Sequence, residues 1–144
     1  MAATVFVLNG PNLNLLGTRE PELYGTATLD DIAGMLTGRA GELGLAVDIR
    51  QSNHEGHLID WLHEAAAAGA KAVILNAGGY THTSVALRDA IAAIAVPVIE
   101  VHLSDPARRE PFRQTNLLAD VCKQSITGLG ARGYIVALDA AAAL

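Results

Sequence analysis

Short apolar runs alternate with segments of helical periodicity along the whole chain, and this alternation constrains the fold more than any other feature. The apolar runs are residues 4–8, 46–51, 72–75, 98–102 and, more weakly, 125–127. The segments of helical character between and after them are residues 28–43, about 53–69, 84–93 and 131–142. Strands that alternate with helices favour repeated βα units and a parallel sheet. The chain is therefore expected to form an α/β fold.

The number and spacing of these segments narrow the fold further. Thr28 is followed three residues later by Asp31, which resembles a capping box, and Gly44 ends the same expected helix. Five strands within 144 residues, with a helix after most of them, favour a flavodoxin-like, doubly wound sheet with strand order 2-1-3-4-5. No internal repeat or linker interrupts the pattern, so we expect one domain over residues 1–144. Ligands of such sheets bind beyond the carboxyl ends of the strands.

The charge and the aromatic content argue against a nucleic-acid partner. The chain carries 10 Lys and Arg residues against 15 Asp and Glu residues, a formal net charge of −5 at pH 7, and 4% aromatic residues. A negative chain repels a phosphate backbone, and few rings are available to stack on bases. Three of the few positive residues do lie close together in the sequence, namely Arg108, Arg109 and Arg113. This cluster is too small for a polyanion but suits one small anionic substrate.

Composition also favours the cytoplasm over a membrane or an oxidising compartment. No apolar run approaches the roughly 20 residues that a membrane helix needs, and no positively charged segment typical of a signal peptide precedes the first strand. Cys122 is the only cysteine, so an intrachain disulfide cannot form. We therefore expect a cytoplasmic protein without a membrane partner.

Two polar loops follow expected strands. The first loop, residues 12–26, contains Gly17, Pro21 and Gly25 and shows no period, and loops of this length are commonly functional or disordered. The second loop, residues 103–113, is basic and contains two prolines, which suits a lid. Polar residues that gather where strands end are Asn9, Asn12, Asn76, His102 and Ser104. The candidate site is therefore expected between the two loops.

Tyr24 and Arg19 lie on one short, proline-stiffened segment of the first loop. An unperturbed phenol titrates at about pH 10, so a tyrosine that acts as a base near neutrality needs neighbouring cations that favour the phenolate. Arg19 can supply such a charge. The alternative is a loop tyrosine that packs its ring under the loop, beside a solvated arginine.

Glu100 and His102 share one face of the expected strand 98–102, because side chains two residues apart in a strand point the same way. A carboxylate beside an imidazole orients the ring and favours its protonated form, which suits a general acid. The alternative is a structural Glu–His pair at the end of a strand.

Asn76, Gly78 and Gly79 lie where the strand 72–75 gives way to a loop. Glycines at this point let the backbone approach a ligand closely, although an ordinary strand-to-helix turn uses the same residue types. His82 follows just before the next helix, where side chains and free amides can face a hydroxyl-bearing ligand. Taken alone, His82 is equally consistent with an exposed histidine without a function.

Three familiar patterns do not carry a function in this chain. Residues 128–133 match G-x-G-x-x-G, but the chain ends before the acidic partner expected about 20 residues further on, so we interpret them as a tight turn with close helix packing. His54, His57 and His63 match no zinc-ligand spacing, so we expect no metal. A serine nucleophile is not supported, because the chain contains no G-x-S-x-G.

Four sequence blocks occur in a fixed order along the chain. They are residues 9–25 with N-G-P-N-L-N-L-L-G, R-E-P and Y-G, residues 51–56 with Q-S-N-H-E-G, residues 76–84 with N-A-G-G and T-H-T-S, and residues 100–104 with E-V-H-L-S. Together they resemble type II 3-dehydroquinate dehydratase, the type II dehydroquinase of the shikimate pathway. The resemblance covers nearly the whole chain, and four blocks in order make it specific.

The resemblance implies that 3-dehydroquinate loses water through an enolate to give 3-dehydroshikimate, without metal, cofactor or Schiff base. It implies that Tyr24 takes a proton from the carbon beside the ketone, that Arg19 keeps Tyr24 as a phenolate, and that Asn12 helps to stabilise the enolate through water. His102, with Glu100 beside it, would donate a proton to the departing hydroxyl. The resemblance implies further contacts to the substrate from Asn76, His82, Arg113 and the backbone of Leu103 and Ser104. Gly78 and Gly79 would lie beside these groups without contacting the substrate.

The resemblance also implies a homo-oligomer, a dodecamer built as a tetramer of trimers, in which Asp89 faces the site of a neighbouring subunit. The match is not uniform in the second loop. Asp105, Pro106 and Ala107 stand where the family commonly has Asn, a bulky aliphatic residue and His, and Gln124 stands where a glycine is usual. We expect these departures to affect the motion of the lid and the affinity for substrate.

Other functions predict different residues in these loops. A flavodoxin-like binding module for a flavin or phosphate ligand would need a Ser/Thr-rich loop after the first strand, where this chain has Pro11 and asparagines. An inactive scaffold would have no reason to keep Arg19, Tyr24, His102 and Arg113 together. The sequence does not distinguish a role in aromatic amino-acid biosynthesis from a role in quinate breakdown.

Overall fold

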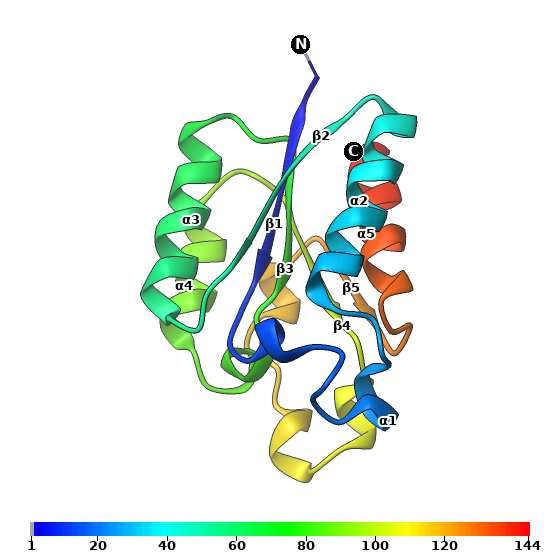
Figure 1. The fold of residues 1–144 in the computed structure, drawn as a ribbon. Helices are drawn as coiled ribbons and strands as arrows, with labels where there is room; N and C mark the ends of the chain where they lie inside the picture. The colour runs from blue at the N-terminus through cyan, green and yellow to red at the C-terminus, as the bar shows by residue number, and fades with distance from the viewer. Residues whose placement is uncertain (1) are drawn as a thin grey trace.

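The computed structural model describes residues 2–144, and its centre is a five-stranded parallel sheet (Figure 1). The strands are β1 (Thr4–Asn9), β2 (Ala46–Gln51), β3 (Ala72–Asn76), β4 (Val98–His102) and β5 (Gln124–Thr127). Their order is β2-β1-β3-β4-β5, and all four neighbouring pairs are parallel. The predicted doubly wound sheet and its strand order are confirmed.

Helices cover both faces of the sheet. The pair α2 (Leu29–Leu43) and α5 (Arg132–Ala142) lies over one face, and the pair α3 (Glu55–Ala67) and α4 (Val85–Ala93) lies over the other (Figure 1). Each pair encloses its own aliphatic core cluster against the sheet. All residues of β3 and β4 are buried, which explains why both strands are almost continuous apolar runs in the sequence. Within residues 2–144, the helices lack the length and apolar character needed to cross a membrane.

Helix starts were predicted well where a capping residue marks them. Thr28 and Asp31 form the capping box, since the Asp31 amide donates to Thr28 Oγ1 and the Thr28 amide donates to Asp31 Oδ2, each at 3.0 Å. Ser84 caps α4 by accepting the Leu87 amide at 2.9 Å. These side chains satisfy amides that the helix itself leaves without a partner.

The first loop is more ordered than its lack of period indicated. It contains a 3-10 turn at Leu13–Leu15 and a four-residue helix, α1 (Pro21–Tyr24). One turn of helix is too short to leave a repeating apolar pattern, so the sequence indicated only a loop here. As a result, Tyr24 stands at the end of a helix and not on a free loop.

The glycine-rich segment before α5 is the tight turn that we predicted. Gly128 and Gly130 have positive φ values of 78° and 59°. A Cβ on Gly133 would lie 3.4 Å from Val101 Cγ1, so α5 packs closely on β4 at this point. The glycines therefore serve the turn and the helix packing.

The turns after β1 and β3 touch each other at the carboxyl end of the sheet. The Gly10 amide donates to the Asn76 carbonyl at 2.8 Å. A Cβ on Gly10 would lie 2.6 Å from the carbonyl oxygen of Ala77, which is too close for any other residue without movement of the backbone. The contact between the two turns therefore depends on the absence of a side chain at Gly10.

We expect Gly10→Ala to lower the free energy of unfolding by about 1 to 3 kcal/mol, because the added methyl group must displace backbone. Gly38→Ala is the matched control, because a Cβ on Gly38 meets nothing within 4 Å and Gly38 lies in the interior of α2. It should raise the free energy of unfolding by about 0.5 to 1 kcal/mol. Urea denaturation measures both, and an unchanged stability of Gly10→Ala would contradict the account.

Candidate functional site

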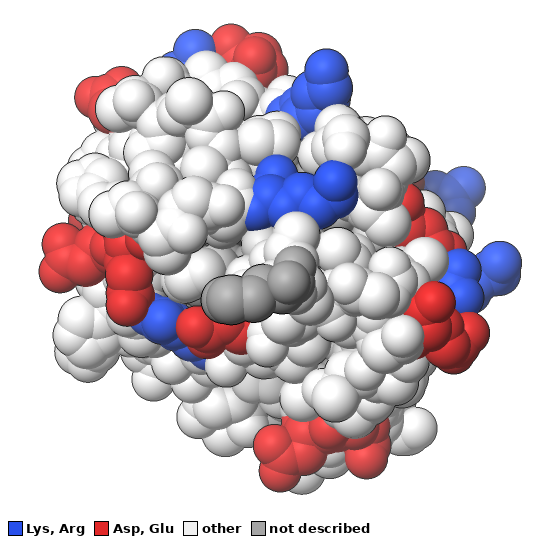
Figure 2. Space-filling view, turned by 90° about the horizontal axis from the view of Figure 1, so that it is seen from above, with Lys and Arg blue, Asp and Glu red and all other residues white. Residues whose placement is uncertain are grey.

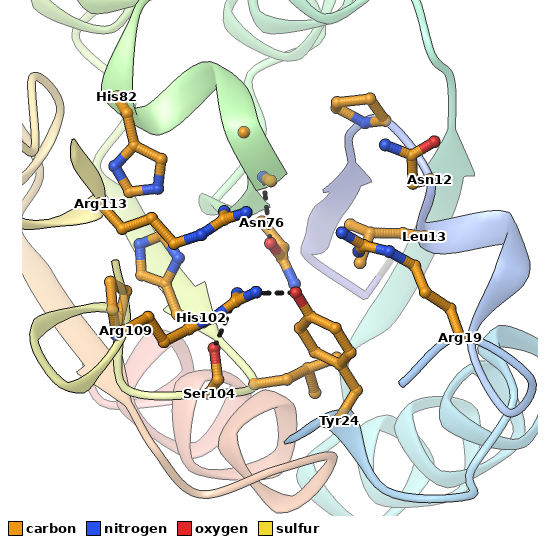
Figure 3. A pocket seen from close by; sticks show the side chains of 15 residues that line it. Asn12, Leu13, Arg19, Tyr24, Asn76, His82, His102, Ser104, Arg109 and Arg113 are labelled. Carbon is orange, nitrogen blue, oxygen red and sulfur yellow. Dashed lines mark hydrogen bonds between the residues drawn. The ribbon is translucent and has the colours of Figure 1, made fainter. Parts of the chain in front are cut away.

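A pocket opens at the carboxyl ends of β1, β3 and β4, where the first and second loops face each other (Figure 3). Its volume of about 170 Å³ suits a small molecule, since drug-sized ligands occupy pockets of about 300 to 1,000 Å³. All the predicted site residues line it except Glu100 and Asp89. Lining residues that were not predicted are Pro11, Leu13 and Pro106, and Arg109 was predicted only as a member of the basic cluster.

The two exceptions lie in different places. Glu100 is buried directly behind His102, with 1% of its surface exposed, and reaches the pocket only through that histidine. Asp89 is exposed on α4 and lies outside the pocket of its own chain. Within one chain, therefore, the structure brings together all the predicted groups except Asp89.

Tyr24 lies between two arginines. Its phenol accepts a hydrogen bond from Arg109 Nη1 at 2.7 Å (Figure 3). The guanidinium carbons of Arg19 and Arg109 lie 4.9 Å and 5.2 Å from the centre of its ring. Both guanidinium groups therefore place a positive charge beside the ring and its oxygen. The sequence assigned this work to Arg19, whereas the guanidinium that touches the oxygen belongs to Arg109.

Arg109 is the functional residue that the sequence did not single out. Its side chain is 10% exposed, whereas the adjacent Arg108 is exposed and lines a separate hollow beside the second loop. Arg109 also lies 3.7 Å from a carboxylate oxygen of Glu20 and 3.5 Å from Ser104 Oγ. Two consecutive arginines in a loop without a period cannot be told apart in a sequence, and only the contact with Tyr24 distinguishes them.

His102 and Glu100 form a buried pair at the end of β4. His102 Nε2 lies 3.0 Å from Glu100 Oε2, and 7% of His102 is exposed. A carboxylate only accepts hydrogen bonds, so Nε2 carries a proton and Nδ1 is the ring nitrogen left for a ligand. The predicted contact between the two side chains is present.

Glu100 remains ionised although it is buried. Burial alone would raise the pKa of Glu100, but hydrogen bonds to the carboxylate and the charge of His102 outweigh it and hold the pKa below its ordinary value. Besides His102, the donors are Ser125 Oγ at 2.5 Å and Asn116 Nδ2 at 3.0 Å. The carboxylate therefore presents a negative charge to the ring of His102.

His82 is held in one tautomer by the main chain. Its Nδ1 lies 2.7 Å from the carbonyl oxygen of Thr115. A carbonyl only accepts, so Nδ1 is the donor and a neutral His82 has its lone pair on Nε2. His82 lines the pocket and can accept a hydrogen bond there from a hydroxyl of a ligand.

Asn76 is fixed by a buried polar chain beneath the pocket. Its Nδ2 donates to Tyr134 Oη at 3.0 Å, and Tyr134 Oη donates to Asn9 Oδ1 at 2.6 Å. Burial raises the pKa of Tyr134, so this residue stays a neutral phenol that both accepts and donates. The backbone N–H of Gly78 donates to Asn76 Oδ1 at 3.2 Å. The second N–H of the Asn76 side chain is left for a ligand.

Asn12 occupies a strained position at the mouth of the pocket. It has a positive φ of 68°, which is uncommon for a residue other than glycine. Its backbone N–H donates to Asn53 Oδ1 at 3.0 Å. Non-glycine residues in the left-handed region cluster at functional sites. The turn holds Asn12 against the pocket, next to Leu13.

Three arginines give the pocket a positive character, namely Arg19, Arg109 and Arg113. At the opposite end of the molecule, which Figure 2 shows, acidic and basic side chains lie interspersed on a mostly uncharged surface. The predicted basic cluster therefore contributes two members, Arg109 and Arg113, to a site for a small anion.

The two lysines of the chain lie away from the pocket. Lys71 precedes β3 and its Nζ donates to the carbonyl oxygen of Leu144 at 2.8 Å, and Lys123 precedes β5. Both positions are at the amino ends of strands, opposite the carboxyl ends where the pocket opens. The site therefore has no lysine amine with which to form an imine.

Comparison with known families identifies one match over almost the whole chain. The model of the family described as Dehydroquinase class II matches residues 3–142. A protein of Rhodopseudomonas palustris (strain BisA53) named 3-dehydroquinate dehydratase is 54% identical over 143 residues, covering 99% of this chain and 95% of that protein. A protein of Rhizobium johnstonii with the same name is 56% identical over 140 residues, covering 97% and 96%.

Solved structures show the same architecture. The crystal structure of type II dehydroquinase from Propionibacterium acnes superposes with a TM-score of 0.96 at 41% identity and covers 100% of this chain and 99% of its own. The type II dehydroquinase from Butyrivibrio crossotus gives a TM-score of 0.95 at 40% identity, with 97% of each chain covered.

Proposed function

The chain belongs to the class II dehydroquinase family, and on this premise we propose that it removes water from 3-dehydroquinate to give 3-dehydroshikimate. The observation that carries the proposal is the hydrogen bond from Arg109 to the phenol of Tyr24, in a pocket that also contains the Glu100–His102 pair. This arrangement offers a base and an acid in one small, positive cavity. Elimination of water beside a ketone needs both.

Tyr24 is the proposed base. As a phenolate, it takes a proton from the carbon beside the ketone, and the electron pair of that C–H bond moves into an enolate. Arg109 supports this step by its hydrogen bond to the oxygen, and Arg19 supports it by its position over the ring. Asn12 contributes by stabilising the enolate through a water molecule, as a donor placed where negative charge develops.

His102 is the proposed acid. The enolate collapses, the C–O bond of the leaving hydroxyl breaks, and a proton from His102 Nδ1 converts that hydroxyl into water. Glu100 holds Nε2 of the same ring, so the proton to be donated is the one on Nδ1. The proton on Tyr24 and the proton lost from His102 balance, and the products are the conjugated enone and one water molecule.

The remaining side chains are proposed to hold the substrate. Asn76 and His82 each have one free hydrogen-bonding group at the pocket and would contact ring hydroxyls. Arg113 would also contact a substrate hydroxyl, and the backbone of Leu103 and Ser104 would hold the carboxylate. The reaction needs no cofactor in this scheme, and a lysine imine has no amine within reach.

We further propose that the chain, as a single domain over residues 1–144, assembles into a dodecamer of four trimers with Asp89 at a neighbouring subunit's site. The exposed position of Asp89 on α4, outside its own pocket, supports such a role. Light scattering of the active protein should give a mass about twelve times that of one 15.0 kDa chain. A fully active monomer would refute this assembly.

The cell would use this reaction in the cytoplasm for the biosynthesis of aromatic amino acids. Breakdown of quinate is the alternative, because the same chemistry serves both directions of metabolism. A strain without the gene that fails to grow unless aromatic amino acids are supplied would support biosynthesis. Normal growth of that strain on minimal medium would contradict it.

The assignment is tested by adding 3-dehydroquinate and following the conjugated enone by ultraviolet absorbance. We expect Tyr24→Phe to lower kcat at least about 100-fold, because the base is lost while the ring and its packing remain. Tyr80→Phe is the matched control, since Tyr80 loses only an exposed hydrogen bond to the Asn53 carbonyl and does not line the pocket. It should keep nearly full activity. Absence of turnover by the unsubstituted protein, or equal turnover by Tyr24→Phe, would overturn the proposal.

A further inference from the structure

Glu100 is held in place by two residues that do not line the pocket. Ser125 on β5 is its neighbour in the strand register, so both side chains project from the same face of the sheet. Ser125 Oγ donates to Glu100 Oε1 at 2.5 Å, and Asn116 Nδ2 donates to the same oxygen at 3.0 Å. The other oxygen, Oε2, is left for His102. Each carboxylate oxygen therefore has its own fixed partners.

The orientation of Asn116 is itself determined by the main chain. Its Oδ1 accepts the amides of Leu118 and Ala119 at 2.8 Å and 3.0 Å. Because Oδ1 is occupied by two donors, Nδ2 must be the end of the amide that faces Glu100. The segment that follows the second loop thereby presents a donor, and not an acceptor, to the carboxylate.

These donors are needed because Glu100 is almost completely buried. An ionised carboxylate in such a position is unfavourable unless hydrogen bonds replace the lost water. The groups that titrate beside it are His102 and Cys122. Burial, and then the charges of Glu100 and Asp120, raise the pKa of the Cys122 thiol to about 12, so Cys122 stays neutral near pH 7. The partners of the Glu100 carboxylate are therefore His102, Ser125 and Asn116.

We propose that Ser125 and Asn116 are positioning residues for the dehydration, which fix the Glu100 carboxylate so that His102 keeps Nε2 on Glu100 and Nδ1 toward the substrate. The proposal rests on the proposed function, in which His102 is the acid. Ser125 and Asn116 act through Glu100, because both lie outside the lining of the pocket. Their loss should therefore slow the chemical step and leave substrate binding almost intact.

The test compares Ser125→Ala with Ser125→Thr. We expect Ser125→Ala to lower kcat about tenfold and to change KM less than about twofold. A change confined to kcat separates this effect from a weaker fit of the substrate, which would raise KM. Ser125→Thr keeps the hydroxyl and should restore the rate.

Two further variants separate this effect from a general disturbance. Lys123→Ala changes an exposed residue directly before the same strand, outside the pocket, and should behave like the unsubstituted protein. Asn116→Asp keeps an oxygen for the Leu118 and Ala119 amides but replaces the donor with a second acceptor. It should lower kcat at pH 7 more than Ser125→Ala does.

The outcomes distinguish this inference from the function on which it rests. If the unsubstituted protein converts 3-dehydroquinate, while Ser125→Ala and Asn116→Asp keep its kcat, the positioning role is wrong and the proposed function stands. The same holds if both variants raise KM and leave kcat unchanged. If the unsubstituted protein shows no turnover, the proposed function is wrong and the inference is wrong with it.

Discussion

The hydrogen bond between Arg109 and Tyr24 joins the two loops over the pocket, and the arrangement of the site depends on it. At 2.7 Å it connects residues that are 85 positions apart in the chain. It is formed in a part-buried place, where a charged donor has a larger effect than in water. The pocket lies between this contact and the strand ends, with the phenol of Tyr24 and the imidazole of His102 on its walls. This one contact thus joins the two loops and places a positive charge beside the phenol oxygen.

Beneath this contact, the parallel sheet provides a rigid polar floor. The last residues of β1, β3 and β4 are Asn9, Asn76 and His102, and all three are buried. Tyr134 links the two asparagines, and Glu100 fixes the histidine. Buried polar groups held by hydrogen bonds have few alternative arrangements, so Asn76 and His102 face the pocket in fixed orientations. The turns that follow β1 and β3 meet closely at Gly10, beside these strand ends.

The sequence predicted the fold because every strand and long helix leaves a local signal. β3 and β4 appear as apolar runs, and Thr28 and Ser84 mark helix starts through capping groups. The topology then brings strand ends together, which is why Asn76 and His102 were placed in one site although they are distant in sequence. Resemblance to a known family supplied the roles of Tyr24 and the other residues, which spacing alone left open.

The rest of the site could not be predicted because it depends on contacts between distant segments. Arg109 and Arg108 are chemically identical and adjacent, and only the folding of the second loop over Tyr24 separates them. Tyr134 reaches Asn9 across 125 positions of the chain. Ser125 and Asn116 are common polar residues with no motif, and their meaning comes from the single carboxylate that they contact. The one-turn helix α1 was too short for any periodic signal.

The central claim is that Tyr24 and Arg109 act as one unit, and a double-mutant cycle tests it most directly. The kcat values of Tyr24→Phe, Arg109→Gln and the double variant are compared, with Arg108→Gln as the control for charge. If the guanidinium works through the phenol, the double variant should be about as slow as Tyr24→Phe alone. Losses that multiply in the double variant, or an Arg108→Gln variant as slow as Arg109→Gln, would contradict the account.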